Sequence, residues 1–215
     1  MIKYLLFILL LLWNLAQGSA SPVLPKLVAE LLEAVQQNDI KSVRERVQRG
    51  MSVDTSDEIG NTLLMRASRA GLPDMVRSLL DMKAEVKKRN SAGDTPLMFA
   101  SLGGNMEIVR MLVDAGAESD HAGWTPIHYC AWAGKTDVCQ YLIKLGVDID
   151  AKSPNGTTPL MMAVRGGHLD TVKLLVWEVA ELEATNDDGA TALQWAIRSN
   201  SQDIIAHLKQ AGARK

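Results

Sequence analysis

Residues 93–98 read G-D-T-P-L-M, and near-copies of this stretch recur along the chain. The copies read G-N-T-L-L-M, G-W-T-P-I-H, G-T-T-P-L-M and G-A-T-A-L-Q, and they start at Gly60, Gly123, Gly156 and Gly189. The leading glycines therefore lie 33, 30, 33 and 33 residues apart. A period of this length indicates one helical unit stacked on copies of itself. We therefore expect an all-α solenoid.

Each unit carries the signals of a helix start shortly after its glycine. Pro96, Pro126 and Pro159 suit the first helical turn, where the missing N–H costs nothing. The threonine before that position is the N-cap candidate, and the members of this set are Thr62, Thr95, Thr125, Thr158 and Thr191. A small residue follows in each unit, before a second helix, and these small residues are Ala67, Ala100, Cys130, Ala163 and Ala196.

These features resemble the ankyrin repeat, whose signature is a turn followed by T-P-L-H-x-A at the start of a helix. The resemblance covers roughly residues 57–212. It implies helix-turn-helix repeats joined by short finger loops, and an array that holds a partner protein rather than carrying out chemistry.

The chain departs from the pattern at several positions. Leu63 and Ala192 replace the proline in the first and last of the five copies, and Lys83 and Val179 stand where a helix-ending glycine is expected. Val179 is the odder of these two, because a β-branched residue resists the left-handed conformation. The interval of 30 residues is short by three, and the shortfall falls in residues 117–123. We therefore expect one clipped finger loop.

The two ends of the array are expected to be caps, because a terminal repeat presents one face to water. Residues 21–56 predict two helices without the signature, which we interpret as an N-terminal capping repeat. Residues 57–215 then hold five repeats, the last of them a C-terminal cap, so the array has about six. The polar positions expected to face outward in the N-terminal cap are Glu33, Gln36, Gln37, Lys41 and Arg44.

Residues 1–20 have the order of a secretory signal peptide. Lys3 is the basic region, residues 4–13 are an uncharged apolar run, and small residues at 18–20 suit cleavage. An uncleaved membrane anchor is the alternative, although the run is short for a span of about 20 residues. Removing Lys3 changes the net charge from −2 to −3, which does not suggest binding to nucleic acid or to an anionic membrane. We expect a periplasmic protein, with secretion as the alternative location.

Cys130 and Cys139 lie nine residues apart, on facing sides of one predicted helix pair. The corresponding pairs in the other repeats are alanine with valine or isoleucine. Two interpretations stay open at this point: a disulfide, which export permits, or two buried thiols acting as small apolar residues. A metal site is not expected, because the spacing is not that of zinc ligands and no histidine pair is adjacent.

No motif in the chain indicates catalysis. The four histidines have no candidate nucleophile at a meaningful spacing, and phosphate-binding and metalloprotease motifs are absent. His128 and His168 occupy repeat positions where bonding to loop backbone is expected. The acceptor pattern for N-glycosylation at Asn155 also fits a repeat turn. We therefore predict a protein that is not an enzyme and needs no cofactor.

The resemblance implies a partner surface built from the first helix of each repeat and from the finger loops. The residue two positions after each small residue should face it, and this row is Arg69, Leu102, Trp132, Arg165 and Arg198. Trp and Arg are enriched at interface hot spots. Trp124 on a finger is a further candidate, for partner contact or for packing on the neighbouring finger. In the row just before the small residues, Phe99 and Met162 are expected in the core, whereas Tyr129 and Trp195 should show an edge.

The function that follows is a periplasmic module that binds another protein. We expect a monomeric inhibitor or immunity factor that sequesters an exported enzyme, such as a cell-wall hydrolase or a toxin. The alternatives are a scaffold or stress-protection protein that supports an envelope or oxidative-stress enzyme, and a secreted effector that binds a host protein.

Overall fold

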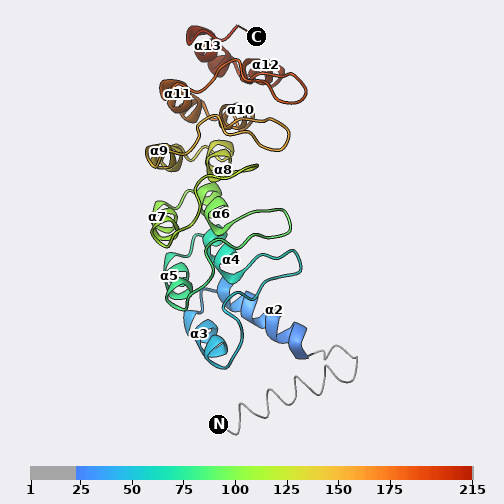
Figure 1. Ribbon diagram of the computed structural model, residues 1–215, viewed down its shortest axis with the longest axis vertical. Helices are drawn as coiled ribbons and strands as arrows, with labels where there is room; N and C mark the ends of the chain where they lie inside the picture. The colour runs from blue at the N-terminus through green and yellow to red at the C-terminus, as the bar shows by residue number, and fades with distance from the viewer. Residues whose placement is uncertain (1–22, 215) are drawn as a thin grey trace.

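The computed structural model describes residues 23–214, so the expected leader, residues 1–20, lies outside the described residues. Pairs of antiparallel helices stack in chain order along one axis (Figure 1). The first helices of the pairs, called inner helices, are α2 Val23–Gln36, α4 Leu63–Ala70, α6 Pro96–Gly103, α8 Pro126–Trp132, α10 Pro159–Arg165 and α12 Ala192–Arg198. The second, called outer helices, are α3 Ile40–Gln48, α5 Pro73–Asp81, α7 Met106–Asp114, α9 Thr136–Lys144, α11 Leu169–Trp177 and α13 Gln202–Gln210.

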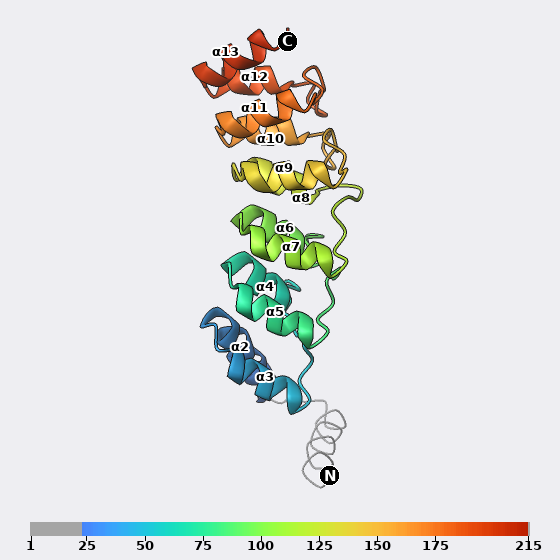
Figure 2. The ribbon, with the colours of Figure 1, turned by 90° about the vertical axis from the view of Figure 1, so that its left-hand side faces the viewer.

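This arrangement confirms the expected all-helical solenoid. The outer helices form one column and the inner helices a second, and the finger loops project from the inner side (Figure 1). In the view turned by 90°, the finger loops lie along one side of the stack and the turns within each helix pair lie along the other (Figure 2). None of the described helices is long and apolar enough to cross a membrane.

The helix starts confirm the predicted caps. The Thr62, Thr95 and Thr158 hydroxyls accept hydrogen bonds from the backbone N–H three residues on, as does Thr191 at α12. In α4 and α6 the cap is reciprocal, because the sulfur of Met65 or Met98 accepts the threonine's own N–H. Each such cap satisfies donors that a helix end leaves free. At α8 the Thr125 hydroxyl instead meets the ring of His128, so there the predicted backbone cap does not form.

The core runs without interruption through the stack, between inner and outer helices. The small residues that the sequence singled out, such as Ala67 and Ala163, are 0% exposed. Leu97, Ile127 and Leu160 at equivalent positions of consecutive inner helices are at most 1% exposed. Each helix pair therefore buries its apolar face against the next pair, as a solenoid requires.

Lys83 and Val179, which replace the expected helix-ending glycine, lie just after the ends of outer helices. Lys83 and Val179 adopt φ of 69° and 68°, close to the 88° and 85° of Gly116 and Gly146 at equivalent positions. The fold therefore imposes the left-handed conformation there whatever residue is present. Val179 is also 82% exposed, so little packing offsets its strain.

We expect Val179→Gly to raise the free energy of unfolding by about 1 kcal/mol, because the left-handed conformation costs an L-residue roughly 1–2 kcal/mol and glycine gives part of that back in chain entropy. Urea denaturation measures the difference. Gly146→Val is the matched reverse change, and an added Cβ at Gly146 meets no atom within 4 Å. It should destabilise by a similar amount, and equal midpoints for both variants and the wild type would contradict the strain.

The finger loops are closed by a side chain that the sequence reading did not single out. A side-chain oxygen at the base of each long finger accepts the backbone N–H four residues on, and the residues that do so are Asp57, Asn90, Ser153 and Asn186. In the finger between α7 and α8, Asp120 instead accepts the N–H of Asp148 in the next finger at 3.2 Å. That finger is the shortened one, as predicted (Figure 1).

Candidate partner-binding surface

The predicted binding row lies in the last turns of consecutive inner helices. We call it the inner-helix row, and its members are Arg69, Leu102, Trp132, Arg165 and Arg198. Consecutive inner helices contact one another directly, so the row is continuous along the stack. Leu102 is half-buried, and the other members are exposed. The fold thus brings together residues that are about one repeat apart in sequence.

Arg165 joins two tryptophans of neighbouring repeats. Its guanidinium carbon lies over the Trp132 ring, 5.5 Å from the centroid, and over the Trp195 ring at 5.8 Å. Such cation–π contacts hold a guanidinium in place at modest cost to its hydration. Trp132 stays 40% exposed, so the stack presents aromatic surface beside a fixed positive charge. We call Trp132, Arg165 and Trp195 the aromatic–arginine stack.

Trp195 was not among the predicted binding residues, although an exposed edge was expected of it. Its side chain is half-buried. The sequence did contain a signal that Trp195 belongs to this surface: it lies three residues before Arg198, and residues three apart lie on the same face of a helix. Residue type alone did not reveal that it meets Arg165 of the preceding repeat.

The N-terminal part of the same face is hollowed. A pocket of about 290 Å³ lies where α2, α4 and α6 meet, and its lining residues are Gln36, Asn61, Met65, Arg66, Arg69, Ala70 and Phe99. The Arg69 guanidinium lies over the Phe99 ring at 5.6 Å. Phe99 is only 7% exposed, which confirms the expectation that it belongs to the core.

Arg66 has its charge satisfied inside the protein. It forms an ion pair with Asp57 at 3.0 Å, and both side chains are mostly buried. Burial raises the pKa of Asp57, but hydrogen bonds from Asn61 and Arg66 outweigh burial and hold this pKa below the ordinary value of aspartate. Arg66 is therefore occupied, unlike the arginines of the inner-helix row.

Tyr129 is also engaged within the protein. Its hydroxyl donates a short hydrogen bond to the Asp94 carboxylate of the preceding finger. Burial, together with Asp94, raises the pKa of Tyr129 above the ordinary tyrosine value. Tyr129 is half-buried and contributes an edge to the surface, as expected. Met162, which was expected in the core, is also only half-buried and packs against the core from its edge.

Trp124 packs in a way that the sequence did not predict. Its ring contacts His128 edge-on, with centroids 5.3 Å apart and an interplanar angle of 76°. His128 belongs to α8, the helix that follows this finger. The contact is local because Trp124 directly precedes Thr125, the N-cap of α8. Trp124 is half-buried, and a partner would reach only its outer edge.

His128 is fully buried and links two repeats. Its Nδ1 accepts the Thr125 N–H at 3.2 Å, so Nε2 carries the proton and donates to the Thr157 carbonyl of the next finger at 3.0 Å. His168 similarly bonds the Trp132 carbonyl at 3.0 Å. Both contacts confirm that these histidines bond loop or helix backbone. Burial, opposed only in part by hydrogen bonds to backbone, lowers the pKa of His128.

We expect His128→Met to destabilise the protein by about 1 kcal/mol at neutral pH, the net value of a lost hydrogen bond. Methionine is the residue at the equivalent positions 65, 98 and 161. Because the folded pKa is lowered, the unfolded chain takes up a proton that the folded protein does not. The stability due to neutral His128 is therefore present above pH about 6.5 and falls below it. Urea unfolding at pH 7.5 and 5.5 should show a smaller loss on acidification for the variant, and an equal loss in both proteins would contradict this.

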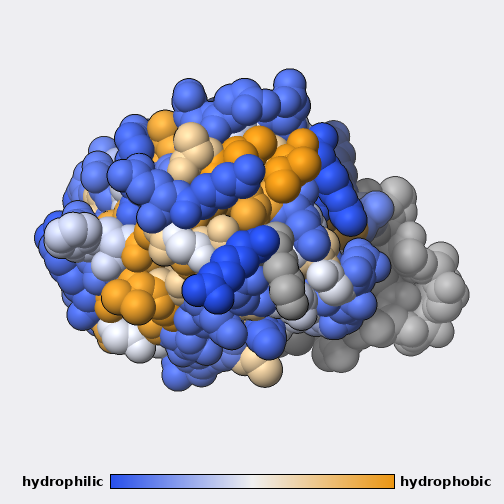
Figure 3. Space-filling model, turned by 90° about the horizontal axis from the view of Figure 1, so that it is seen from above, coloured by the Kyte–Doolittle hydropathy of each residue, from blue (hydrophilic) through white to orange (hydrophobic). Residues whose placement is uncertain are grey.

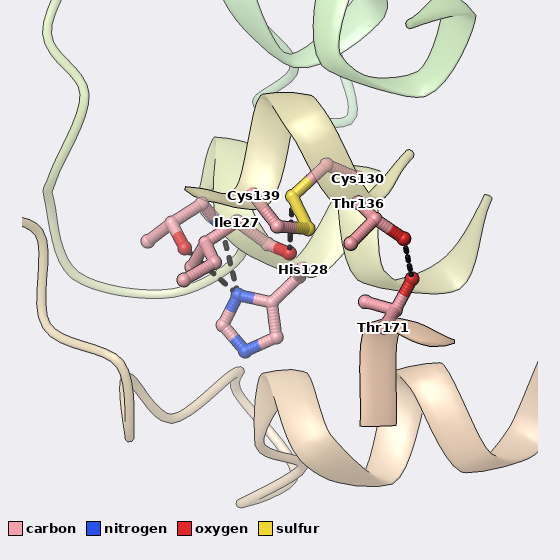
Figure 4. The surroundings of a disulfide bond; sticks show 7 residues. Ile127, His128, Cys130, Thr136, Cys139 and Thr171 are labelled. Atoms are coloured by element: carbon pink, nitrogen blue, oxygen red, sulfur yellow. Dashed lines mark hydrogen bonds between the residues drawn. A yellow bond between two sulfur atoms is a disulfide. The ribbon is translucent and has the colours of Figure 1, made fainter. Parts of the chain in front are cut away.

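Of the two interpretations of the cysteines, the structure shows the disulfide. Cys130 in α8 and Cys139 in α9 are bonded, with Cα atoms 5.6 Å apart, and both are 0% exposed. Figure 4 shows the bond crossing between the two helices, while Thr136 faces Thr171 of the next repeat. These two hydroxyls are 2.8 Å apart. Cys130 lies two residues before Trp132 in α8, so the disulfide links the helix that carries Trp132 to α9.

The described residues contain no group of three or more His, Cys, Asp or Glu side chains that is placed to hold a metal ion. Viewed from the C-terminal end, the surface is largely hydrophilic, with smaller apolar patches (Figure 3). Ile197 is 52% exposed. The C-terminal repeat thus has the mixed but mostly polar face expected of a cap.

Stacked helix pairs with an exposed inner-helix row define a repeat protein of the solenoid class. A family model described as "Ankyrin repeats (3 copies)" matches residues 82–153 and 145–215, and one described as "Ankyrin repeat" matches residues 59–91. The chain therefore belongs to the ankyrin repeat family. Ankyrin repeats imply protein binding, so partners of this chain are expected to be proteins.

Two curated relatives share part of this array. Protein phosphatase 1 regulatory subunit 27 of Mus musculus is 34% identical over 126 residues, which cover 58% of this chain and 62% of the relative. The protein of the same name from Homo sapiens is 46% identical over 39 residues, covering 18% and 25%. The chain thus matches less than two thirds of either relative. Their names describe subunits that regulate an enzyme, a role consistent with binding rather than catalysis.

Proposed function

We propose that this chain is a periplasmic protein-binding module that inhibits an exported enzyme, such as a cell-wall hydrolase or a toxin. The observation that carries the proposal is the aromatic–arginine stack, in which exposed Trp132 and Arg165 form one patch with half-buried Trp195. Trp and Arg are the side chains that most often dominate binding energy. The inner-helix row extends this patch along the stack.

Two further observations support the compartment and the regulatory role. Disulfides persist in oxidising compartments and are rare in the cytosol, so the bond between Cys130 and Cys139 fits export. The signal-like order of residues 1–20 points the same way. The relatives are named as regulatory subunits of an enzyme, and a regulator of an exported enzyme is the corresponding role that we propose here.

Capture from a periplasmic extract tests the proposal. The wild-type protein is immobilised beside a triple variant with Leu102→Ala, Trp132→Ala and Arg165→Ala, and beside Trp177→Ala. Trp177 is 83% exposed at the end of outer helix α11, so it controls for nonspecific binding to an exposed indole. A true partner is retained by the wild type and by Trp177→Ala and is lost with the triple variant.

The captured protein then decides between the candidate roles. An inhibitor should reduce the activity of a captured hydrolase or toxin in proportion to the complex formed. A scaffold should leave the activity of its captured enzyme unchanged while protecting the enzyme against inactivation. Equal capture by the wild type and the triple variant would move the binding surface away from the inner helices.

A further inference from the structure

The inner helices from α4 onward carry charge of one sign only. From α4 to α12 they contain Arg66, Arg69, Arg165 and Arg198, and they contain no aspartate or glutamate. The whole chain nevertheless has more acidic than basic residues, 25 against 23. Its acidic residues are therefore displaced to the outer helices, the fingers and the N-terminal repeat, and the inner-helix face is locally positive.

Three acids in the first turns of the outer helices form ion pairs with outer-helix residues rather than with this face. Asp74 and Glu107, in the first turns of α5 and α7, both form ion pairs with Arg77, at 2.8 and 2.7 Å. Asp170 in α11 is 3.7 Å from Lys173. These pairs lie among outer-helix side chains. Asp137 and Asp203, in the first turns of α9 and α13, are exposed and form no ion pair with an inner arginine among the described residues.

The side chains of Arg69, Arg165 and Arg198 have no hydrogen bond or ion pair with any described residue. Aromatic rings contact Arg69 and Arg165 through their guanidinium carbons, and such contacts leave the N–H donors of the guanidinium edge free. An arginine edge matches a carboxylate with two parallel hydrogen bonds. The aromatic–arginine stack thus presents a positioned carboxylate receptor beside apolar indole surface.

We propose that the inner-helix row binds an extended acidic segment of its partner protein. This inference rests on the proposed function. The segment runs along the stack, across the inner helices, with carboxylates on Arg165 and Arg198. Neighbouring packed helices lie roughly 8–10 Å apart, and an extended chain advances about 3.3 Å per residue. Two acidic residues about three positions apart therefore match Arg165 and Arg198.

A second contact extends the same segment toward the N-terminal end. Arg69 lies three inner helices before Arg165, which corresponds to roughly 24–30 Å. An acidic residue about eight positions farther along an extended chain reaches it. The pocket of about 290 Å³ beside Arg69 and Phe99 would take an apolar side chain of the segment there.

A purely structural role for these arginines makes a different prediction. An arginine in the last turn of a helix stabilises the helix dipole, and its removal would lower stability without changing binding to an anion. The two roles are separated by measuring binding and unfolding on the same variants. Arg110 supplies the matched control, because it is an exposed arginine over a Tyr141 ring at 5.2 Å, but on outer helix α7.

The test uses a fluorescent Gly/Ser peptide of about ten residues with aspartate at every third position, and a second peptide with asparagine at the same positions. Fluorescence anisotropy at low salt should show binding about tenfold tighter for the aspartate peptide. Arg165→Gln should weaken this binding about tenfold and Arg198→Gln somewhat less. Arg165→Lys should keep only part of the wild-type affinity, because lysine cannot form the two parallel hydrogen bonds that arginine offers a carboxylate. Arg110→Gln should bind like the wild type.

Equal binding of the two peptides would overturn the inference, as would an equal loss in Arg110→Gln and Arg165→Gln. The proposed function is tested separately, by capturing the partner from extract. A partner that needs Trp132 but is indifferent to salt and to Arg165→Gln would leave the protein-binding function standing and refute the acidic segment. A partner captured equally by the triple variant would refute the inner-helix site itself.

Discussion

Trp132→Ala is expected to weaken partner binding by about 2 kcal/mol or more, a loss of roughly 30-fold in affinity. Trp132 lies centrally in the array, on α8, where hot spots tend to cluster. Its ring is 40% exposed and fixed by Arg165. Truncation therefore removes both the contact area and the support that orients the guanidinium.

The cost in stability should be smaller than the cost in binding. Removing one cation–π contact at an exposed site costs about 0.5–1 kcal/mol, and the surrounding helix needs no rearrangement. Titration of the captured partner by calorimetry gives the affinity, and urea denaturation gives the stability. Trp177→Ala, on the outer helices, should leave the affinity unchanged. An unchanged affinity in Trp132→Ala would place the interface elsewhere, with the fingers around Trp124 as the next surface to test.

The double variant Cys130→Ala/Cys139→Val is expected to lower the free energy of unfolding by roughly 2–3 kcal/mol. The cross-link closes a loop with a sequence separation of 9 residues, and chain-entropy estimates for a loop of that size give this magnitude. The new residues copy the pair at positions 67 and 76 of an earlier repeat. Packing should therefore be kept while the cross-link is lost.

Two measurements check this expectation. The urea midpoint of the double variant should fall below that of the oxidised wild type and match that of the reduced wild type. The exported protein, denatured without reductant, should resist labelling by a thiol reagent. Free labelling of both cysteines, or equal midpoints for oxidised wild type and variant, would contradict the bond as a source of stability.

Local sequence was sufficient to predict most of the fold. The threonine caps, the prolines that start α6, α8 and α10, and the shortened finger all depend on residues within a few positions of one another. Their physical causes act along the chain: a cap bonds the N–H three residues on, and proline needs no N–H in the first turn. The repeat length then forces the stacking, because one helix pair cannot bury its own apolar face.

The candidate site was predicted in part. The repeat register correctly placed the inner-helix row in the last turns of consecutive helices, and the small residues identified which side is buried. The contact of Trp124 with His128 was not expected from the sequence, and the role of Trp124 in partner contact stays a prediction. The side chains that close the fingers, such as Asn90 and Asn186, were missed because they vary in residue type between repeats.

The sequence by itself determined the helical solenoid, its repeat boundaries, the absence of recognisable catalytic motifs and the row of arginines and tryptophans along the inner helices. Only the tertiary structure decided that Trp195 approaches Arg165 from the following repeat, that Cys130 and Cys139 are bonded, and that the side chains of Arg69, Arg165 and Arg198 pair with no carboxylate among the described residues. The physical reason is distance along the chain. Helix caps and apolar periodicity are local and repeat in every unit, whereas contacts between units depend on how consecutive helices are offset, which no single repeat encodes.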